Sequence, residues 1–163
     1  MLPARPSLIT LLLLLSSLVV SCSRLDPLTI ESVQSAEAKW RTSKPGMYRL
    51  AVEMKGDRIE PNRFEITVRG EDVTIRRNGD VIVPAKPRDY AMEGWFRMLR
   101  QELDLASNPA MLGAPVGYSS YPMAQFDSES GRLIRFQRSV GGVQNSIEIN
   151  ILKFETEGQA SRP

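Results

Sequence analysis

An alternation of apolar and polar residues that starts at Met47 constrains the fold of this chain more than any other feature of its sequence. Side chains on a β-strand point alternately to the two faces of a sheet, so a period of two predicts a strand with one buried face. The pattern occurs in residues 47–55, 64–69 and 73–76. The apolar positions of these segments are Tyr48, Leu50, Val52, Met54, Phe64, Ile66, Val68, Val73 and Ile75.

Turn signals separate these three segments. Residues 56–62 are polar and predict a turn, and Gly70-Glu71 predicts a tight connection. Asn78-Gly79 is a strong signal for a two-residue hairpin turn, so residues 81–83 are expected to pair back briefly. Short connections join antiparallel neighbours, which predicts a meander.

A second group of strands is predicted after residue 120. Residues 123–127, 132–139 and 146–154 are rich in apolar and β-branched residues. The residues between them, 127–131 and 140–142, contain the glycine and small polar residues that are typical of turns.

Two segments instead have the 3.6-residue apolar period of an amphipathic helix. The first is predicted over 30–42, with Thr29 as its N-cap, and Leu28 and Val33 stand at the spacing of a hydrophobic staple. The second is predicted from residue 92, with Asp89 as its cap and Asn108-Pro109 as its end. Its apolar positions are Met92, Trp95, Phe96, Leu99 and Leu103.

The element order is therefore helix, strands, helix, strands. Segregated antiparallel strands with two helices predict an α+β fold. We expect a twisted antiparallel sheet of about six strands with both helices packed on one face. The same order is compatible with an internal duplication, although no residue-level repeat is found.

The N-terminal segment predicts export. Arg5 precedes a nearly unbroken apolar run over 8–20, which is short for a membrane span and typical of a secretory signal peptide. The run ends in Val19-Val20-Ser21-Cys22, which resembles a bacterial lipobox. By that resemblance Cys22 becomes the acylated N-terminus of the mature chain. The alternatives are an incidental cysteine after a plain signal and an uncleaved anchor.

These signals divide the chain into four expected parts. Residues 1–21 are the lipoprotein signal peptide, and 22–28 are the acylated cysteine with a short tether. Residues 29–155 form a single α+β domain, and 156–163 form a flexible tail. In a host with two membranes, Ser23 after the cysteine resembles an address to the outer membrane, with the domain facing the periplasm.

Composition excludes several classes of site. Removing 1–21 deletes one arginine and lowers the formal charge from +2 to about +1, so charge gives no argument for a nucleic-acid partner. The chain has no histidine and one cysteine. A Ser-His-Asp triad, a Cys-His pair and a typical zinc site are therefore excluded. We expect no catalytic residue, no metal and no cofactor.

Several short features along the mature chain together carry a family resemblance. They are Trp40, Tyr48, the strand and turn of 73–81, Trp95-Phe96, Val116, Tyr118, Tyr121-Pro122 and Asp127. With these residues the chain from about Trp40 to Phe154 resembles the DUF6174 group of bacterial lipoproteins. Where that group often has Asp and Gly, this chain has Ser119 and Ser120. The resemblance implies an envelope-anchored α+β domain and implies no reaction.

The densest local cluster is Tyr118, Tyr121, Pro122 and Asp127. The functional hypothesis is a ligand or partner contact here, with tyrosine rings as platforms and Asp127 as a hydrogen-bond acceptor. The favoured interpretation is a structural corner, in which Tyr-Pro enters a strand and Asp127 closes a turn through its own backbone.

Four arginines of the first meander form a second candidate, namely Arg63, Arg69, Arg76 and Arg77. Their guanidinium groups suit contacts with anionic lipid head groups. The favoured interpretation is an ordinary solvated face, because Glu65, Glu71 and Asp72 lie among them.

The leading functional prediction is a membrane-anchored, non-enzymatic binding or adaptor module with a protein partner in the cell envelope. The alternative is a lipoprotein that holds a small or lipidic ligand between sheet and helices. An apolar pocket would favour the ligand, whereas a filled core with an exposed apolar patch would favour the adaptor. A carboxylate hydrolase would need two facing acids in a cleft, and no spacing selects such a pair.

Overall fold

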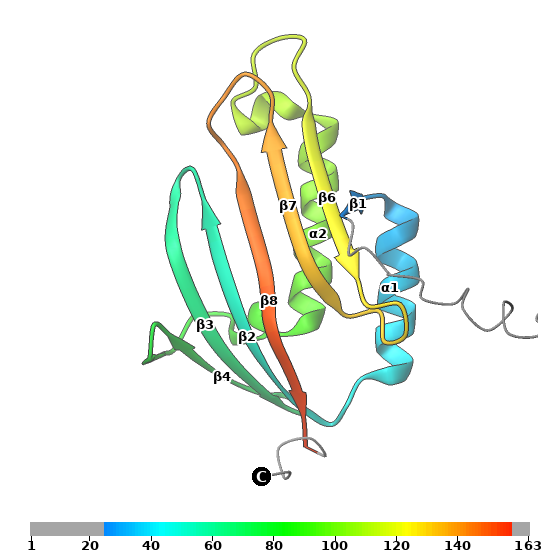
Figure 1. Ribbon diagram of the computed structural model, residues 1–163, viewed down its shortest axis with the longest axis vertical. Helices are drawn as coiled ribbons and strands as arrows, with labels where there is room; N and C mark the ends of the chain where they lie inside the picture. Colours follow the sequence, from blue (N-terminus) through cyan, green and yellow to red (C-terminus); the bar gives the residue numbers. More distant parts are fainter. Residues whose placement is uncertain (1–24, 158–163) are drawn as a thin grey trace, which may run out of the picture.

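The chain forms one antiparallel sheet with two helices on one face (Figure 1). The computed structural model describes residues 25–157, so Cys22, the predicted signal peptide and the end of the tail lie outside the described residues. The strands are β1 (Asp26–Pro27), β2 (Met47–Gly56), β3 (Ile59–Arg69), β4 (Asp72–Arg77), β5 (Asp80–Ile82), β6 (Ser120–Phe126), β7 (Leu133–Val140) and β8 (Ile147–Thr156). The helices are α1 (Ile30–Ser43), α2 (Met92–Ser107) and the short 3₁₀ helices η2 (Pro87–Tyr90) and η3 (Pro109–Leu112).

The predicted α+β class is confirmed, but the predicted count of about six strands is wrong. The sheet has eight strands in the order β1-β6-β7-β8-β2-β3-β4-β5, and every pair is antiparallel. The shortest strands lie at the two edges: β1 has two residues and β5 has three. The brief pairing expected for residues 81–83 corresponds to β5, whereas β1 is missed because two residues are too short to show an alternation.

The sheet joins two meanders. Strands β2 to β5 form one, β6 to β8 form the other, and β8 pairs with β2 between them. The predicted tether of 22–28 overlaps this sheet, because Asp26 pairs opposite Ala124 and Pro27 opposite Met123. The amide of Leu28 then donates to the Pro122 carbonyl oxygen at 3.0 Å. The chain therefore joins the fold before the predicted domain boundary at residue 29.

Helix α1 begins as predicted. The hydroxyl of Thr29 accepts from the Ser32 amide, and the Ser32 hydroxyl accepts from the Thr29 amide, both at 3.1 Å. This reciprocal capping box satisfies two amides that the helix leaves unpaired. Leu28 and Val33, the predicted staple residues, are both buried.

Helix α2 does not begin at the predicted cap. Asp89 lies in η2 and pairs with Arg97 at 2.6 Å, whereas the N-cap position is Ala91, which has no capping side chain. The free Met92 amide instead donates to the Tyr48 hydroxyl of β2 at 3.1 Å. The helix start is therefore set by a tertiary contact, which local sequence rules do not reveal.

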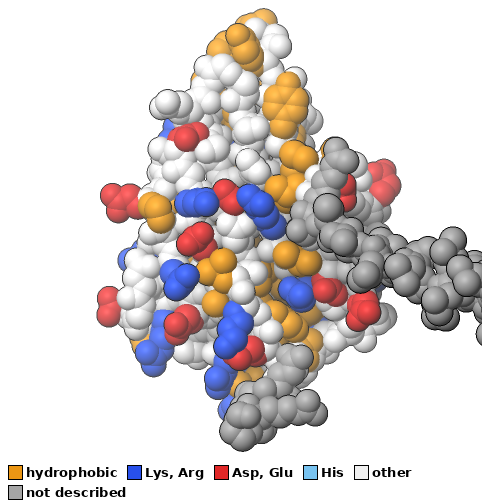
Figure 2. Space-filling model, in the orientation of Figure 1, with side chains coloured by type: hydrophobic (Ala, Val, Ile, Leu, Met, Phe, Trp, Pro, Cys, Tyr) orange, Lys and Arg blue, Asp and Glu red, His pale blue; other side chains and the backbone are white. Residues whose placement is uncertain are grey.

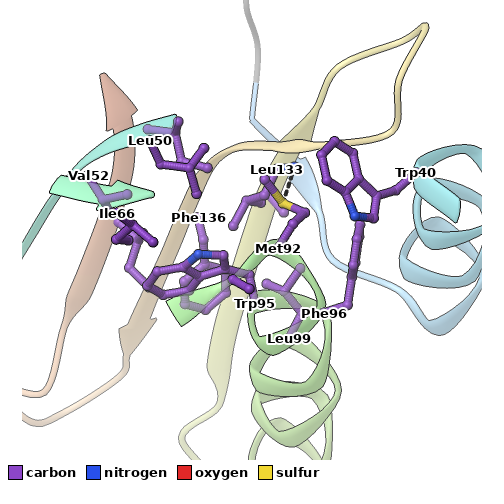
Figure 3. Packing of buried hydrophobic residues seen from close by; sticks show 14 of the residues in the cluster. Trp40, Leu50, Val52, Ile66, Met92, Trp95, Phe96, Leu99, Leu133 and Phe136 are labelled. Atoms are coloured by element: carbon purple, nitrogen blue, oxygen red, sulfur yellow. Dashed lines mark hydrogen bonds between the residues drawn. The ribbon is translucent and has the colours of Figure 1, made fainter. Parts of the chain in front are cut away.

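The core lies between the helices and the inner face of the sheet (Figure 3). The apolar stripe of α2 is buried as predicted, and the Leu133 amide lies 3.3 Å from the Met92 sulfur. The indole of Trp40 meets the Tyr48 ring edge-on at 5.3 Å. The largest fully buried side chains include Trp40, Tyr48, Phe96, Phe136, Ile66 and Met92. Each such side chain stabilises the fold by roughly 1.5–3 kcal/mol relative to its exposed state.

Candidate functional site

The predicted cluster around Tyr118 is not brought together. Tyr118 and Tyr121 lie at the start of β6, with 54% and 58% of their surfaces exposed. Asp127 follows the other end of this seven-residue strand. Strand residues advance about 3.4 Å each, so neighbours in the sequence become distant when a strand separates them.

Asp127 closes a turn through its neighbours' backbone, as the favoured interpretation of this cluster predicts. Its Oδ1 accepts from the Ser130 amide and hydroxyl at 2.8 Å and from the Glu129 amide at 3.2 Å, and its Oδ2 pairs with Arg132 at 3.2 Å. The Ser130 amide, together with that hydroxyl and Arg132, holds the pKa of Asp127 below its ordinary value, because these donors favour the charged form.

The four arginines do not share one surface. Arg76 pairs opposite Glu65 in the sheet and Arg77 opposite Phe64, so their side chains point to opposite faces. Arg63 and Arg69 are separated from Glu65 on β3 by even numbers of residues. Their side chains therefore point to the same face as Glu65 and Arg76. That face is free of helices and carries cations and carboxylates side by side (Figure 2).

A shallow hollow of about 430 Å³ lies on this helix-free face, over β2, β3, β4 and β8. Its side chains are mostly charged or polar, and Lys153 pairs with Glu155 at 2.7 Å at its border. Further along β8, Glu148 accepts from Arg135 at 2.6 Å and lies 3.4 Å from Lys55. Part of the charge on this face is therefore neutralised by ion pairs.

An apolar groove of about 520 Å³ lies on the opposite, helix-covered side of the sheet, between α2, η2 and strands β2 and β3. We call it the helix-side groove. Its apolar lining is Met54, Phe64, Pro84, Ala85, Tyr90, Trp95 and Met98. Charged and polar groups stand at its border, where Asp89 and Arg97 form their ion pair beside Lys86 and Gln101.

Gly94 shapes this groove. A Cβ atom at Gly94 would overlap the backbone carbonyl of Asp89, so only glycine lets η2 lie against the first turn of α2. Glycine inside a helix costs about 1 kcal/mol relative to alanine. In return, η2 approaches closely enough for the Tyr90 ring to lie 5.5 Å from the Phe64 ring at the groove.

The opposite end of α2 leads into a region without charge. Residues 108–121 and 140–146 contain no Asp, Glu, Lys or Arg in a chain that is 25% charged. We call these two segments the uncharged tip. They lie together at the top of the molecule, where Figure 2 shows neither red nor blue side chains. Val116 is fully exposed, and Met111, Tyr118 and Tyr121 are mostly exposed.

A buried ion pair holds the uncharged tip in place. The Arg138 Nη1 lies 3.0 and 2.9 Å from the two carboxylate oxygens of Glu102, and both residues are only 7% exposed. The Arg138 Nη2 donates to Asn145 Oδ1 at 2.9 Å, and Asn145 Nδ2 donates to the Leu112 carbonyl at 2.7 Å. The network thus connects α2 and β7 with both segments of the tip.

Sequence reasoning missed this pair although a signal was present. Glu102 follows Leu99 by three residues and therefore stands on the apolar stripe of α2. Arg138 follows Phe136 by two residues and therefore points to the inner face of β7. Two opposite charges at inward positions predict a buried pair, because an unpaired buried charge is costly. The uncharged composition of 105–126 is likewise readable from the sequence.

The remaining carboxyl groups with shifted pKa values are explained by structural partners. Burial raises the pKa of Glu93 and Glu148, but it is outweighed by a hydrogen bond from Lys44 to Glu93 and by bonds from Asn150 and Arg135 to Glu148. Hydrogen bonds from Ser146 lower the pKa of Asp57. Among residues 25–157, every carboxyl group with a resolved shift is thus held in its charged form.

Within the described part of the chain, no group of three or more metal-binding side chains is found. No helix among those residues is long and apolar enough to cross a membrane. No protein-family model matches the sequence, and no curated protein matches it at a significant level. The resemblance to the DUF6174 group therefore stays a prediction.

Proposed function

We propose that the chain is a lipid-anchored, non-enzymatic binding protein of the cell envelope that holds an apolar or lipidic ligand in the helix-side groove. The observation that carries this proposal is the groove itself. Its volume of about 520 Å³ falls in the range of about 300–1,000 Å³ that is usual for ligand pockets. An apolar lining with a few polar groups at the border is also the usual character of such sites.

The groove suits an amphipathic ligand. Its apolar part would lie against Met54, Phe64 and Met98, where contact removes hydrocarbon from water. Lys86 at the border would attract an anionic head group such as a carboxylate or a phosphate, whereas Arg97 there is already paired with Asp89. We therefore propose a fatty acid or a single-chain lipid as the class of ligand.

The anchor rests on the N-terminal sequence pattern. An acylated Cys22 would hold the molecule at a membrane, in keeping with the lipobox that ends in Val20-Ser21-Cys22. Several acyl chains on one cysteine give a firm anchor, since each buried methylene adds about 0.8 kcal/mol. In a host with two membranes, we propose the outer membrane, with the folded part in the periplasm.

Binding of a fluorescent fatty acid to the purified protein tests the groove. Ala85 is exposed at the groove, so Ala85→Trp would fill the apolar space without disturbing the core. The matched control is Ala38→Trp, which places the same ring on an exposed position of α1. We expect Ala85→Trp to abolish binding and the control to retain it. Equal binding by both variants, or none by the unaltered protein, would exclude the groove as the site.

Metabolic labelling with an alkyne fatty acid tests the anchor independently. We expect the label on the unaltered chain and none on Cys22→Ser, which lacks the acceptor thiol. Because Cys22 is the only cysteine, a thioether-linked label has one possible position. Label that remains on Cys22→Ser would contradict this assignment.

A second candidate function is the adaptor, and the edge strand β5 favours it. One side of β5 has no strand partner in the sheet, and Val81 and Val83 are exposed there. Such an edge can accept a strand from a protein partner. In-cell crosslinking of the lipidated protein, with Val81→Lys as the blocked variant, tests this candidate. A crosslinked partner that Val81→Lys does not weaken would argue against the β5 edge.

A further inference from the structure

We propose that the uncharged tip inserts into the interfacial region of the lipid bilayer and so makes a second membrane contact beside the acyl anchor. Met111, Val116, Tyr118 and Tyr121 would be the inserted side chains, since all four are exposed in the free protein. The proposal rests on the proposed function in one respect, because the lipid anchor places the protein at a membrane. The affinity of the tip for the bilayer is argued from the tip residues alone.

The composition of the tip fits a bilayer better than it fits water. A charged side chain at membrane depth is costly, and the tip has none. Tyrosine is enriched at membrane–water interfaces, because its ring is apolar and its hydroxyl group can remain hydrated. Insertion would also remove the fully exposed Val116 and the exposed Met111 from water.

Several backbone amides of the tip already have hydrogen-bond partners within the protein. An unpaired amide costs several kcal/mol in hydrocarbon, and many tip amides are paired within the tip. Gly113 donates to Ala110, Tyr118 donates to Pro115, and Gly141 donates to Ser119, at 2.9 to 3.1 Å. Part of the tip backbone is therefore already hydrogen-bonded before any contact with lipid.

The tip is rigid as well as apolar. The Glu102–Arg138 pair and Asn145 fix the Leu112 carbonyl from below. Above them, the Tyr118 ring lies against the backbone of Gly141 and Gly142, where any Cβ atom would approach it within 3.3 Å. A surface that is already ordered loses little conformational entropy on binding.

The anchor and the tip can reach the same surface. Four residues of extended chain from Cys22 to Asp26 span at most about 14 Å. Asp26 pairs opposite Ala124, and from there to Ser120, the first residue of β6, a strand also spans about 14 Å. A membrane that holds the acyl chains is therefore within reach of the tip when the β1–β6 edge leans toward it.

Charged residues at the border would limit the depth of insertion. Asp57 accepts from the Ser146 amide at 2.7 Å, and Arg58 donates to the Gln144 carbonyl at 3.1 Å. This charged β2–β3 hairpin therefore lies directly beside the 140–146 segment of the tip. Its charges favour the head-group region and oppose deeper burial.

The experiment places an environment-sensitive fluorophore on the tip of the lipidated protein in neutral phosphatidylcholine vesicles. Acylation consumes the only native cysteine, so Val116→Cys creates a single free thiol for the fluorophore NBD. The matched control is Val83→Cys, which is equally exposed but lies beside β5. We expect a blue-shifted emission at position 116 that a lipid-soluble quencher reduces, and a water-like emission at position 83.

Adding Met111→Asp to the Val116→Cys chain should lower the inserted fraction about tenfold, because it places a charge in the contact. Salt should leave insertion unchanged, since the tip has no charge to screen. Water-like emission at 116, equal emission at both positions, or insertion only into anionic vesicles at low salt would overturn the proposal. The mass of the N-terminal peptide reports acylation separately, so a missing anchor is distinguished from a tip that does not insert.

Discussion

Strand β7 has a carboxylate–arginine pair near each end, and the two pairs differ in almost every other respect. Glu102 and Arg138 stand below the uncharged tip with about 10% and 9% of their side chains exposed. Asp127 and Arg132 stand at the opposite end with 28% and 22% exposed. The first pair joins α2 to β7 across the fold, whereas the second joins two residues of one turn.

The difference teaches that the same two functional groups can order very different lengths of chain. The Asp127 pair closes a turn that its own sequence already favours. The Glu102 pair helps to order two loops through Asn145 and the Leu112 carbonyl, and so connects them to α2 and β7. Because the Glu102–Arg138 pair is buried, separating its charges costs much free energy. The pair therefore favours a single conformation of the two loops.

The largest expected effect is that of Arg138→Met. It leaves Glu102 buried without its partner, and removing one partner of a buried pair costs about 3–5 kcal/mol. Urea unfolding at neutral pH measures this change in the free energy of unfolding. The double variant Glu102→Leu with Arg138→Met should recover most of the loss, because no charge is then left buried. A double variant as unstable as the single one would show that packing, and not charge, dominates.

Gly142→Ala should have the next largest effect, about 1–3 kcal/mol, because its φ of +75° is strained for alanine and its Cβ atom would meet Pro115 at 2.9 Å. Gly79→Ala is the matched control, with a φ of +97° and no atom within 4 Å. The difference between the two unfolding free energies isolates the contact between the two tip segments. Equal losses would mean that the 108–121 segment does not depend on this contact.

Asp127→Asn should cost about 1 kcal/mol at pH 7, since the turn keeps part of its hydrogen bonding but loses the charge. The folded state lowers the pKa of Asp127, so its stabilisation is present above the unfolded pKa of about 3.9 and is lost as pH falls through the folded pKa. Unfolding measured at pH 7, 5 and 3 should show the variant and the parent converging at acid pH. A difference as large at pH 3 as at pH 7 would contradict a charge-based role.

Tyr121→Phe should have the smallest effect on stability, within about 0.5 kcal/mol, because its exposed hydroxyl makes no hydrogen bond with described residues. Tyr48→Phe is its buried counterpart and removes the acceptor of the Met92 amide, so it should cost more. Thermal unfolding of both variants checks the contrast. Similar losses would show that Tyr121 has a structural role in the tip.

Much of the fold could be predicted because alternation and helical periodicity are local signals. The strand of Tyr48, Leu50 and Val52 and the stripe of Met92 and Leu99 follow from spacing alone. The cap of α2 could not be predicted, since it depends on Tyr48, which is distant in the sequence. Asp89 is a reasonable cap by local rules, and η2 places it elsewhere.

The candidate sites were harder to predict for a different reason. The cluster of Tyr118 and Asp127 was inferred from nearness in the sequence, which a strand converts into distance. The helix-side groove depends on the angle between α2 and strands β2 and β3, and no short motif encodes that angle. The uncharged tip, in contrast, needs only a search for missing charges along 105–126.

The two-residue strand β1 also has a mechanical consequence. A force applied at Cys22 would reach the fold first through β1 and through the bond from the Leu28 amide to Pro122. Detaching residues 26–28 would add about 10 Å of extended chain before Thr29 and leave the pairing of β2 to β8 intact. The capping box of α1 would then bear the load next. If the chain is anchored as proposed, detachment of β1 would extend the connection to the membrane before the rest of the sheet is strained.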